Sequence, residues 1–146
     1  MDAFETFTLP FSDMDQLLLT LDSETLYQEL RQVVQHRGSG LEKTRLYKND
    51  MVEVLLLTWE PGYSTLPHNH AANGCWLKVL HGSLVETRYD TELVQQQVTD
   101  LPKNAISFMS NNFGYHAICN SSVDVTWSLH VYSPPGHQTT YFHLVL

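Results

Sequence analysis

Two of the eight histidines in this chain of 146 residues, His68 and His70, are separated by a single residue. Residues two apart in an extended strand project from the same face, so the two imidazoles can lie side by side. Imidazole is the commonest metal ligand in proteins. Most isolated pairs of this kind are polar residues on the surface. By itself this pair is at most half of a candidate metal site.

The residues around this pair follow a recognisable spacing. Residues 62–82 contain a glycine, the two histidines, Cys75 and a second glycine at the intervals of the first cupin motif, with Cys75 in the usual place of an acidic ligand. Residues 114–120 resemble the end of the second cupin motif, with one residue fewer between the glycine and His116. The resemblance implies a cupin jelly roll. The implied metal ligands are His68, His70 and His116.

Three imidazoles without a carboxylate suit zinc, copper, iron and nickel about equally, so the ligand types do not choose the metal. The missing carboxylate leaves the charge of a divalent ion less neutralised, which favours an anionic substrate ligand such as a thiolate. Cys75 could be a fourth ligand or serve another purpose, and spacing leaves both open.

A second polar pattern lies near the end of the chain. Ser128, His130 and Tyr132 alternate with Leu129 and Val131, so three polar side chains share one face of a strand. This face is either the solvent side of a half-exposed strand or a hydrogen-bonded row inside the barrel, with His130 orienting Tyr132. The pattern alone does not decide between them.

The elements that must position these residues are mostly strands. Residues 12–36 have helical spacing, with Ser12 or Asp13 and then Asp22 or Ser23 as helix caps. From about residue 45 the pattern is β, with turns at Pro and Gly pairs. Expected strands are 51–59, 75–80, 83–89, 92–98, 105–108, 115–120, 123–132 and 139–146. We therefore predict a mainly β fold, a jelly-roll barrel (41–146) with a short N-terminal helical cap (1–40), in one domain.

Composition excludes several classes of function. The net charge of −8 disfavours nonspecific binding to nucleic acid or to an anionic membrane surface. An apolar fraction of 42% with 16% charged residues is typical of a globular protein. Two cysteines do not make a disulfide framework, and no signal peptide or spanning segment is apparent. We expect a cytoplasmic protein with reduced thiols, and a monomer.

The chain from about Arg45 to its C-terminus resembles the cysteine dioxygenase family, iron-dependent thiol dioxygenases of the cupin superfamily. The matching segments are 59–62, 68–75, 77–86, 114–120 and 128–135. The last three contain residues beyond the general cupin spacing, so they carry the resemblance to this family.

The resemblance implies a role for each site residue. His68, His70 and His116 would bind Fe(II), and Cys75 would stand where animal members form a thioether with a tyrosine, here Tyr132. Ser128 and His130 would support Tyr132 through hydrogen bonds, and Arg45 would grip the substrate carboxylate. L-Cysteine would chelate iron through its thiolate and amine, and both atoms of O2 would pass to sulfur, giving cysteine sulfinate.

Two departures leave the substrate open. Lys43 stands where the family usually has a tyrosine, and the segment after Pro135 is short. The alternatives are a dioxygenase for 3-mercaptopropionate or another small thiol, and a cupin that binds a small molecule without catalysis. Trp59 is expected to be core, and the other four histidines, His137 among them, are expected to be surface or turn residues.

Overall fold

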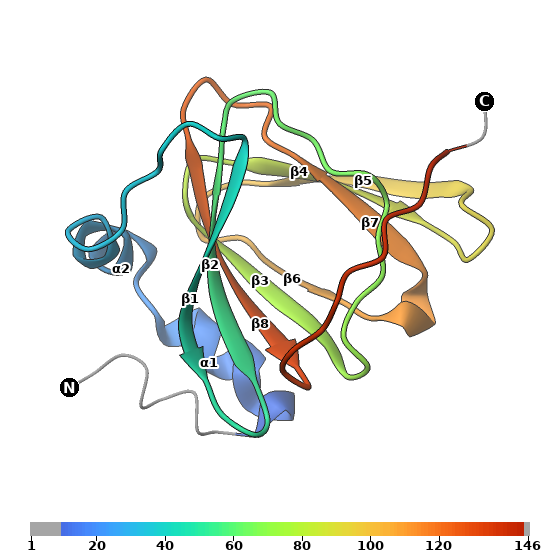
Figure 1. Cartoon of the computed structure of the whole chain (residues 1–146), viewed down its shortest axis with the longest axis horizontal. Coiled ribbons are helices and arrows are strands. Elements are labelled where there is room, and N and C mark those ends of the chain that lie inside the picture. Colours follow the sequence, from blue (N-terminus) through green and yellow to red (C-terminus); the bar gives the residue numbers. More distant parts are fainter. Residues whose placement is uncertain (1–9, 145–146) are drawn as a thin grey trace.

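Two antiparallel sheets face each other in the computed structural model, which describes residues 10–144 (Figure 1). The larger sheet has the order β1 (Leu41–Lys48), β2 (Glu53–Trp59), β8 (Thr126–Ser133), β3 (Gly74–His81) and β6 (Ile106–Met109). The smaller sheet has the order β5 (Gln95–Leu101), β4 (Leu84–Tyr89) and β7 (Tyr115–Cys119). A short 3₁₀ turn, η3 (Asn111–Phe113), precedes β7.

The N-terminal helices cover the outer face of the larger sheet. A 3₁₀ turn, η2 (Phe11–Asp13), leads into α1 (Met14–Thr20), and α2 (Ser23–Leu30) follows. The Asp22 side chain caps α2 by accepting a hydrogen bond from the Thr25 amide. Leu18 and Leu26 pack in one apolar cluster with Val54 and Leu129 of the sheet. This packing gives the outer face its own core and leaves the inner face for the site.

Strand register decides which side chains meet on the inner face. On β2, β8 and β3, Glu53 lies opposite Tyr132 and Tyr132 lies opposite Cys75. Two residues along β8, His130 lies between Leu55 and Leu77. The alternation of Ser128, His130 and Tyr132 therefore belongs to the inner face, since their neighbours Leu129 and Val131 are in the outer cluster.

The last described segment runs across the open end of the barrel. After β8 the chain passes beside the segment between β2 and β3, and Figure 1 shows the two lying together. The Asn69 amide donates to the Thr140 carbonyl over 3.1 Å, and the Phe142 amide donates to the Pro67 carbonyl over 2.8 Å. This segment therefore borders the site described below.

The predicted fold agrees with the structure in its main elements. The mainly β architecture and the two N-terminal helices are confirmed, but the Asp13 side chain makes no capping hydrogen bond to α1, and the second helix ends at Leu30. The strand expected at 92–98 lies at Gln95–Leu101. A strand at 41–48 was not expected as a separate element, since its residues are polar and half exposed. The strand expected at 139–146 is wrong for its described part, where the chain forms a single bridge at Tyr141. Residues 1–9 of the helical cap and 145–146 lie outside the described residues. No described helix is long and apolar enough to cross a membrane.

Candidate metal centre

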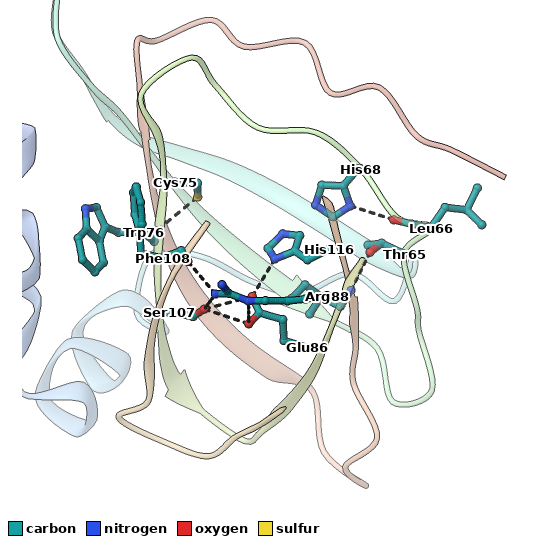
Figure 2. Close-up of polar contacts among 11 residues, drawn as sticks. Thr65, Leu66, His68, Cys75, Trp76, Glu86, Arg88, Ser107, Phe108 and His116 are labelled. Atoms are coloured by element: carbon teal, nitrogen blue, oxygen red, sulfur yellow. Dashed lines mark hydrogen bonds and ion pairs between the residues drawn. The ribbon is translucent and has the colours of Figure 1, made fainter. Parts of the chain in front are cut away.

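The three predicted ligands meet at one point. Their ligand atoms all lie within 4.8 Å of one another. Ring centroids are 4.4 Å apart for His70 and His116, 4.7 Å for His68 and His116, and 5.5 Å for His68 and His70. His116 comes from β7 (Figure 2), whereas His68 and His70 lie between β2 and β3 and not in a regular strand as expected. Two isolated bridges, between Ser64 and Cys119 and between His68 and His116, hold this loop against β7.

Hydrogen bonds orient two of these rings and leave the third without a partner. The His68 Nδ1 lies 2.9 Å from the Leu66 carbonyl, and the His116 Nδ1 lies 2.8 Å from Glu86 Oε2 (Figure 2). Each of these contacts directs the Nε2 of the same ring towards the cluster. Both nitrogens of His70 are buried without a hydrogen-bond partner among the described residues. A buried polar atom without a partner is costly, and a metal ion would remove that cost.

The protonation of the cluster also fits a metal. Burial lowers the pKa of His68 to about 3 and that of His70 to about 2, and the neighbouring His116 adds to both shifts. These rings are therefore neutral near pH 7, which is the form that binds metal ions. Neutral imidazoles at this separation fit a divalent transition metal.

A buried carboxylate supports the cluster from behind. Glu86 is 2% exposed, and besides His116 it contacts Arg88 Nε at 3.0 Å and accepts from Ser107 at 3.1 Å (Figure 2). Burial opposes the charged form of Glu86, but the hydrogen bond and charge of His116 and the charge of Arg88 outweigh it and lower its pKa. An ionised Glu86 fixes the orientation of His116 and raises the basicity of its ring.

A hydrogen-bonded row continues along β8. Trp59 Nε1 donates to Ser128 Oγ over 2.8 Å, and that hydroxyl lies 2.7 Å from His130 Nε2. The rings of His130 and Tyr132 are nearly parallel, at 19°, with centroids 6.1 Å apart. Burial lowers the pKa of His130 to about 3, so this ring is neutral. The structure therefore places the polar face of β8 in the interior and not on the solvent side.

Cys75 and Tyr132 are direct cross-strand neighbours between β3 and β8. Both line the cavity that contains the three histidines. Burial raises the pKa of the Cys75 thiol, and burial together with Cys75 raises the pKa of the Tyr132 hydroxyl. Both groups therefore carry their protons near pH 7. In this state Cys75 is not a thiolate, so it is a poor ligand for a metal ion at the three histidines.

Comparison with known families identifies this arrangement. The model of the family "Cysteine dioxygenase type I" matches residues 24–144, which is most of the chain. The chain belongs to the cysteine dioxygenase type I family. It is 31% identical over 94 residues to cysteine dioxygenase type 1 of Rattus norvegicus, and equally identical to that of Homo sapiens. Each alignment covers 60% of this chain and 47% of the relative. The chain thus spans about half the length of the curated relatives it matches.

Solved structures confirm the cupin fold. A protein from Klebsiella pneumoniae with a double-stranded β-helix domain superposes with a TM-score of 0.63 at 17% identity, covering 77% of this chain and 87% of that one. A cupin superfamily protein from Desulfitobacterium hafniense gives 0.58 at 19% identity, covering 71% and 86%. The barrel is thus shared more widely than the dioxygenase family itself.

Arg45, which the dioxygenase resemblance assigns to the substrate carboxylate, lies outside the cavity of the three histidines. Arg45 is not among the described residues that line the cavity. Its side chain is 59% exposed, and its guanidinium lies 3.7 Å from the Glu53 carboxylate. Lys43, two residues earlier on β1, is also exposed but lines the cavity. The register explains the difference, because Lys43 pairs with Leu57, which also lines the cavity, and Arg45 pairs with Leu55, which does not.

Sequence reasoning missed several residues of this family site. Glu86 falls in a matching segment, but no role was predicted for it. Its signal was its position two residues after Leu84, which places both side chains on the same face of the strand. Trp59 was expected to be a core residue. It is buried, and it also lines the cavity. His137, expected on the surface, has a buried Nε2 without a partner among the described residues. Tyr141 lines the cavity with its ring 5.4 Å from that of His68.

Proposed function

We propose that this chain is an iron-dependent thiol dioxygenase that converts L-cysteine and O2 to cysteine sulfinic acid. One observation carries the proposal. Three imidazoles converge in a cavity that Cys75 and Tyr132 also line, and both nitrogens of His70 lack a hydrogen-bond partner among the described residues. The family to which the chain belongs supports the same chemistry. We also propose that the protein acts as a monomer in the cytoplasm.

The residues His68, His70 and His116 would hold the iron. Iron bound there would supply the redox chemistry by which O2 reacts with a thiolate. No carboxylate is in the ligand set, so the ion keeps most of its charge and favours an anionic sulfur from the substrate. Glu86 would keep the His116 ring fixed in the orientation that ligation needs.

Tyr132 would hold the substrate and the oxygen in place. Its pKa is raised by burial, so the hydroxyl keeps its proton and donates a hydrogen bond. The Tyr132 ring lies beside the His130 ring, which Ser128 holds by a hydrogen bond, so these two residues would restrict its position. A thioether between Cys75 and Tyr132 would form by loss of the thiol hydrogen and one ring hydrogen, with two electrons and two protons passing to O2. Their cross-strand pairing supports this bond.

The substrate carboxylate would meet a cation of β1. Arg45 is the residue that the family resemblance proposes, and it shares a strand face with Lys43. For Arg45 to take this role, its side chain would have to leave Glu53 and turn towards the cavity.

The test is oxygen uptake by protein loaded with Fe(II) under anaerobic conditions. We expect O2 consumption with L-cysteine, with both atoms of isotopically labelled O2 recovered in the sulfinate product. A strong preference for 3-mercaptopropionate would contradict the assignment of L-cysteine and favour the alternative substrate. His116→Ala should lose iron and activity together, and the exposed His143→Ala is its control. No O2 uptake with any thiol would favour a cupin that binds without catalysis.

A further inference from the structure

We propose that Lys43, and not Arg45, selects substrates that carry a carboxylate, and that His137 holds the same group from the other side. This inference rests on the proposed thiol dioxygenase function and deepens it. The carboxylate site would be a side pocket that adjoins the metal cavity. It is lined by Lys43, Glu53, Leu55, Tyr132, His137 and Thr139.

Lys43 stands where the metal cavity and the side pocket meet. Of the described residues lining either space, it is the one lysine or arginine. Its position on β1, opposite Leu57, directs it to the inner face of the sheet. Lys43 lines the same cavity as His68 and His130. Its ammonium therefore stands in the wall of the space in which an anion beside the histidines would bind.

Arg45 has a different partner and a different effect. Its guanidinium faces Glu53, whose carboxylate also accepts a hydrogen bond from the Gly136 amide over 3.2 Å. Glu53 lines the side pocket, and its negative charge would repel a substrate carboxylate. By pairing with Glu53, Arg45 weakens that repulsion without touching the substrate. It is a positioning residue for this pocket.

His137 supplies the second observation that points to a ligand. Its Nε2 is buried and has no hydrogen-bond partner among the described residues. A carboxylate in the side pocket would give this nitrogen a partner. The negative charge would favour the imidazolium form, so that one carboxylate oxygen accepts from His137 and the other from Lys43. Thr139 completes the wall.

The arrangement predicts which thiols are distinguished. L-Cysteine and 3-mercaptopropionate carry the carboxylate, whereas cysteamine has the same thiol and amine without it. A hydrogen bond to a charged group contributes about 10- to 100-fold to affinity. Lys43 should therefore contribute that factor for the two acids and nothing for cysteamine.

The experiment measures binding and turnover separately on iron-loaded protein. Anaerobic calorimetry gives Kd for L-cysteine and cysteamine, and oxygen uptake gives KM and kcat. The variants are Lys43→Gln, Lys43→Arg, Arg45→Gln and His137→Gln. Lys48→Gln is the matched control, an exposed lysine of the same strand that lines neither space. Thermal unfolding of each variant shows whether it is folded.

Lys43→Gln should raise Kd and KM for L-cysteine about 10-fold or more while leaving Kd for cysteamine unchanged. Lys43→Arg should restore most of the loss, because it restores the charge. His137→Gln should give a smaller loss with the same selectivity. Arg45→Gln should change Kd for L-cysteine less than Lys43→Gln does, and Lys48→Gln should match the unmodified protein.

Three results would overturn the inference. In the first, Arg45→Gln and not Lys43→Gln raises Kd for L-cysteine. In the second, Lys43→Gln raises Kd for cysteamine as much as Kd for L-cysteine. In the third, L-cysteine does not bind to the unmodified protein. Failure of the proposed function looks different, since no thiol would then support O2 uptake. The calorimetric comparison of the two ligands would still decide the role of Lys43.

Discussion

Among the three proposed metal ligands, His116 has the most extensive network of hydrogen bonds behind its ring. Its Nδ1 faces Glu86, which in turn contacts Arg88 and Ser107, so the ring is fixed by a network and not by one contact. The ligand set contains no carboxylate, yet one stands directly behind His116. If a metal ion is bound, a carboxylate in this place would make the imidazole a stronger donor and would leave a coordination position for the proposed substrate.

Replacing that carboxylate tests this idea. Glu86→Gln keeps the shape of the side chain but removes the charge that faces His116. We expect affinity for Fe(II) to fall about 10- to 100-fold, measured by anaerobic titration against a competing chelator. The exposed Glu92→Gln is the control and should have no effect. An unchanged affinity in Glu86→Gln would show that the network holds the fold and not the metal.

The pairing of Cys75 with Tyr132 gives a second prediction at this scale. After exposure to Fe(II), L-cysteine and O2, intact-mass spectrometry should show a fraction of the chain lighter by two hydrogen atoms. A cross-linked peptide containing both residues should appear after proteolysis. Cys75→Ser should abolish the lighter species, and Cys119→Ser should not. A lighter species that persists in Cys75→Ser would rule out this bond.

At the scale of elements, the site depends on how three segments approach each other. The loop between β2 and β3 brings His68 and His70 to β7. The turn before β7 sets where the strand that carries His116 begins. Gly114 in that turn has φ of +100°, and a Cβ there would lie 2.1 Å from the Tyr89 carbonyl oxygen. The glycine of the second motif is therefore required because β4 and the turn are in close contact.

Gly114→Ala should consequently destabilise the protein. The strained φ and the clash with backbone together should lower the free energy of unfolding by about 2 kcal/mol or more, measured by urea denaturation. Gly62→Ala is the matched control, since Gly62 has φ of +83° but nothing within 4 Å of its Cβ position. It should lose about 1 kcal/mol, from the backbone conformation alone. Equal losses would show that contact with β4 does not matter.

At the scale of the whole molecule, the barrel encloses neutral histidines in an acidic chain. Burial holds the pKa of His68, His70 and His130 well below 6.5. An unfolded chain takes up protons on these rings as the pH falls below about 6.5, and the folded protein does not. Their contribution to stability is thus complete above that pH and decreases as the pH falls towards the folded values.

This linkage can be measured on metal-free protein. The free energy of unfolding should fall between about pH 6 and pH 5, and His130→Gln should reduce that fall by about 1 kcal/mol per pH unit. His130 suits this test because it is not one of the three proposed metal ligands. The exposed His143→Gln should leave the slope unchanged. An identical slope in His130→Gln would mean that His130 is protonated in the folded state as well.

Local patterns were enough to predict much of this protein. Alternation and turn residues predicted most strands, helix caps predicted α1 and α2, and motif spacing selected His68, His70 and His116. These features depend on neighbours along the chain, and the sequence displays them directly. The strand at 41–48 escaped prediction because its residues are polar and half exposed.

The tertiary structure decided what depends on contacts between distant segments. It placed Glu86 behind His116, and it turned the polar face of β8 inward because Leu129 and Val131 pack under the helices. The sequence by itself determined that β1 carries two cations two residues apart. Only the register of β1 on β2 decided that Lys43 lines the cavity and that Arg45 faces Glu53, because one step along a strand pair changes which neighbour a side chain meets.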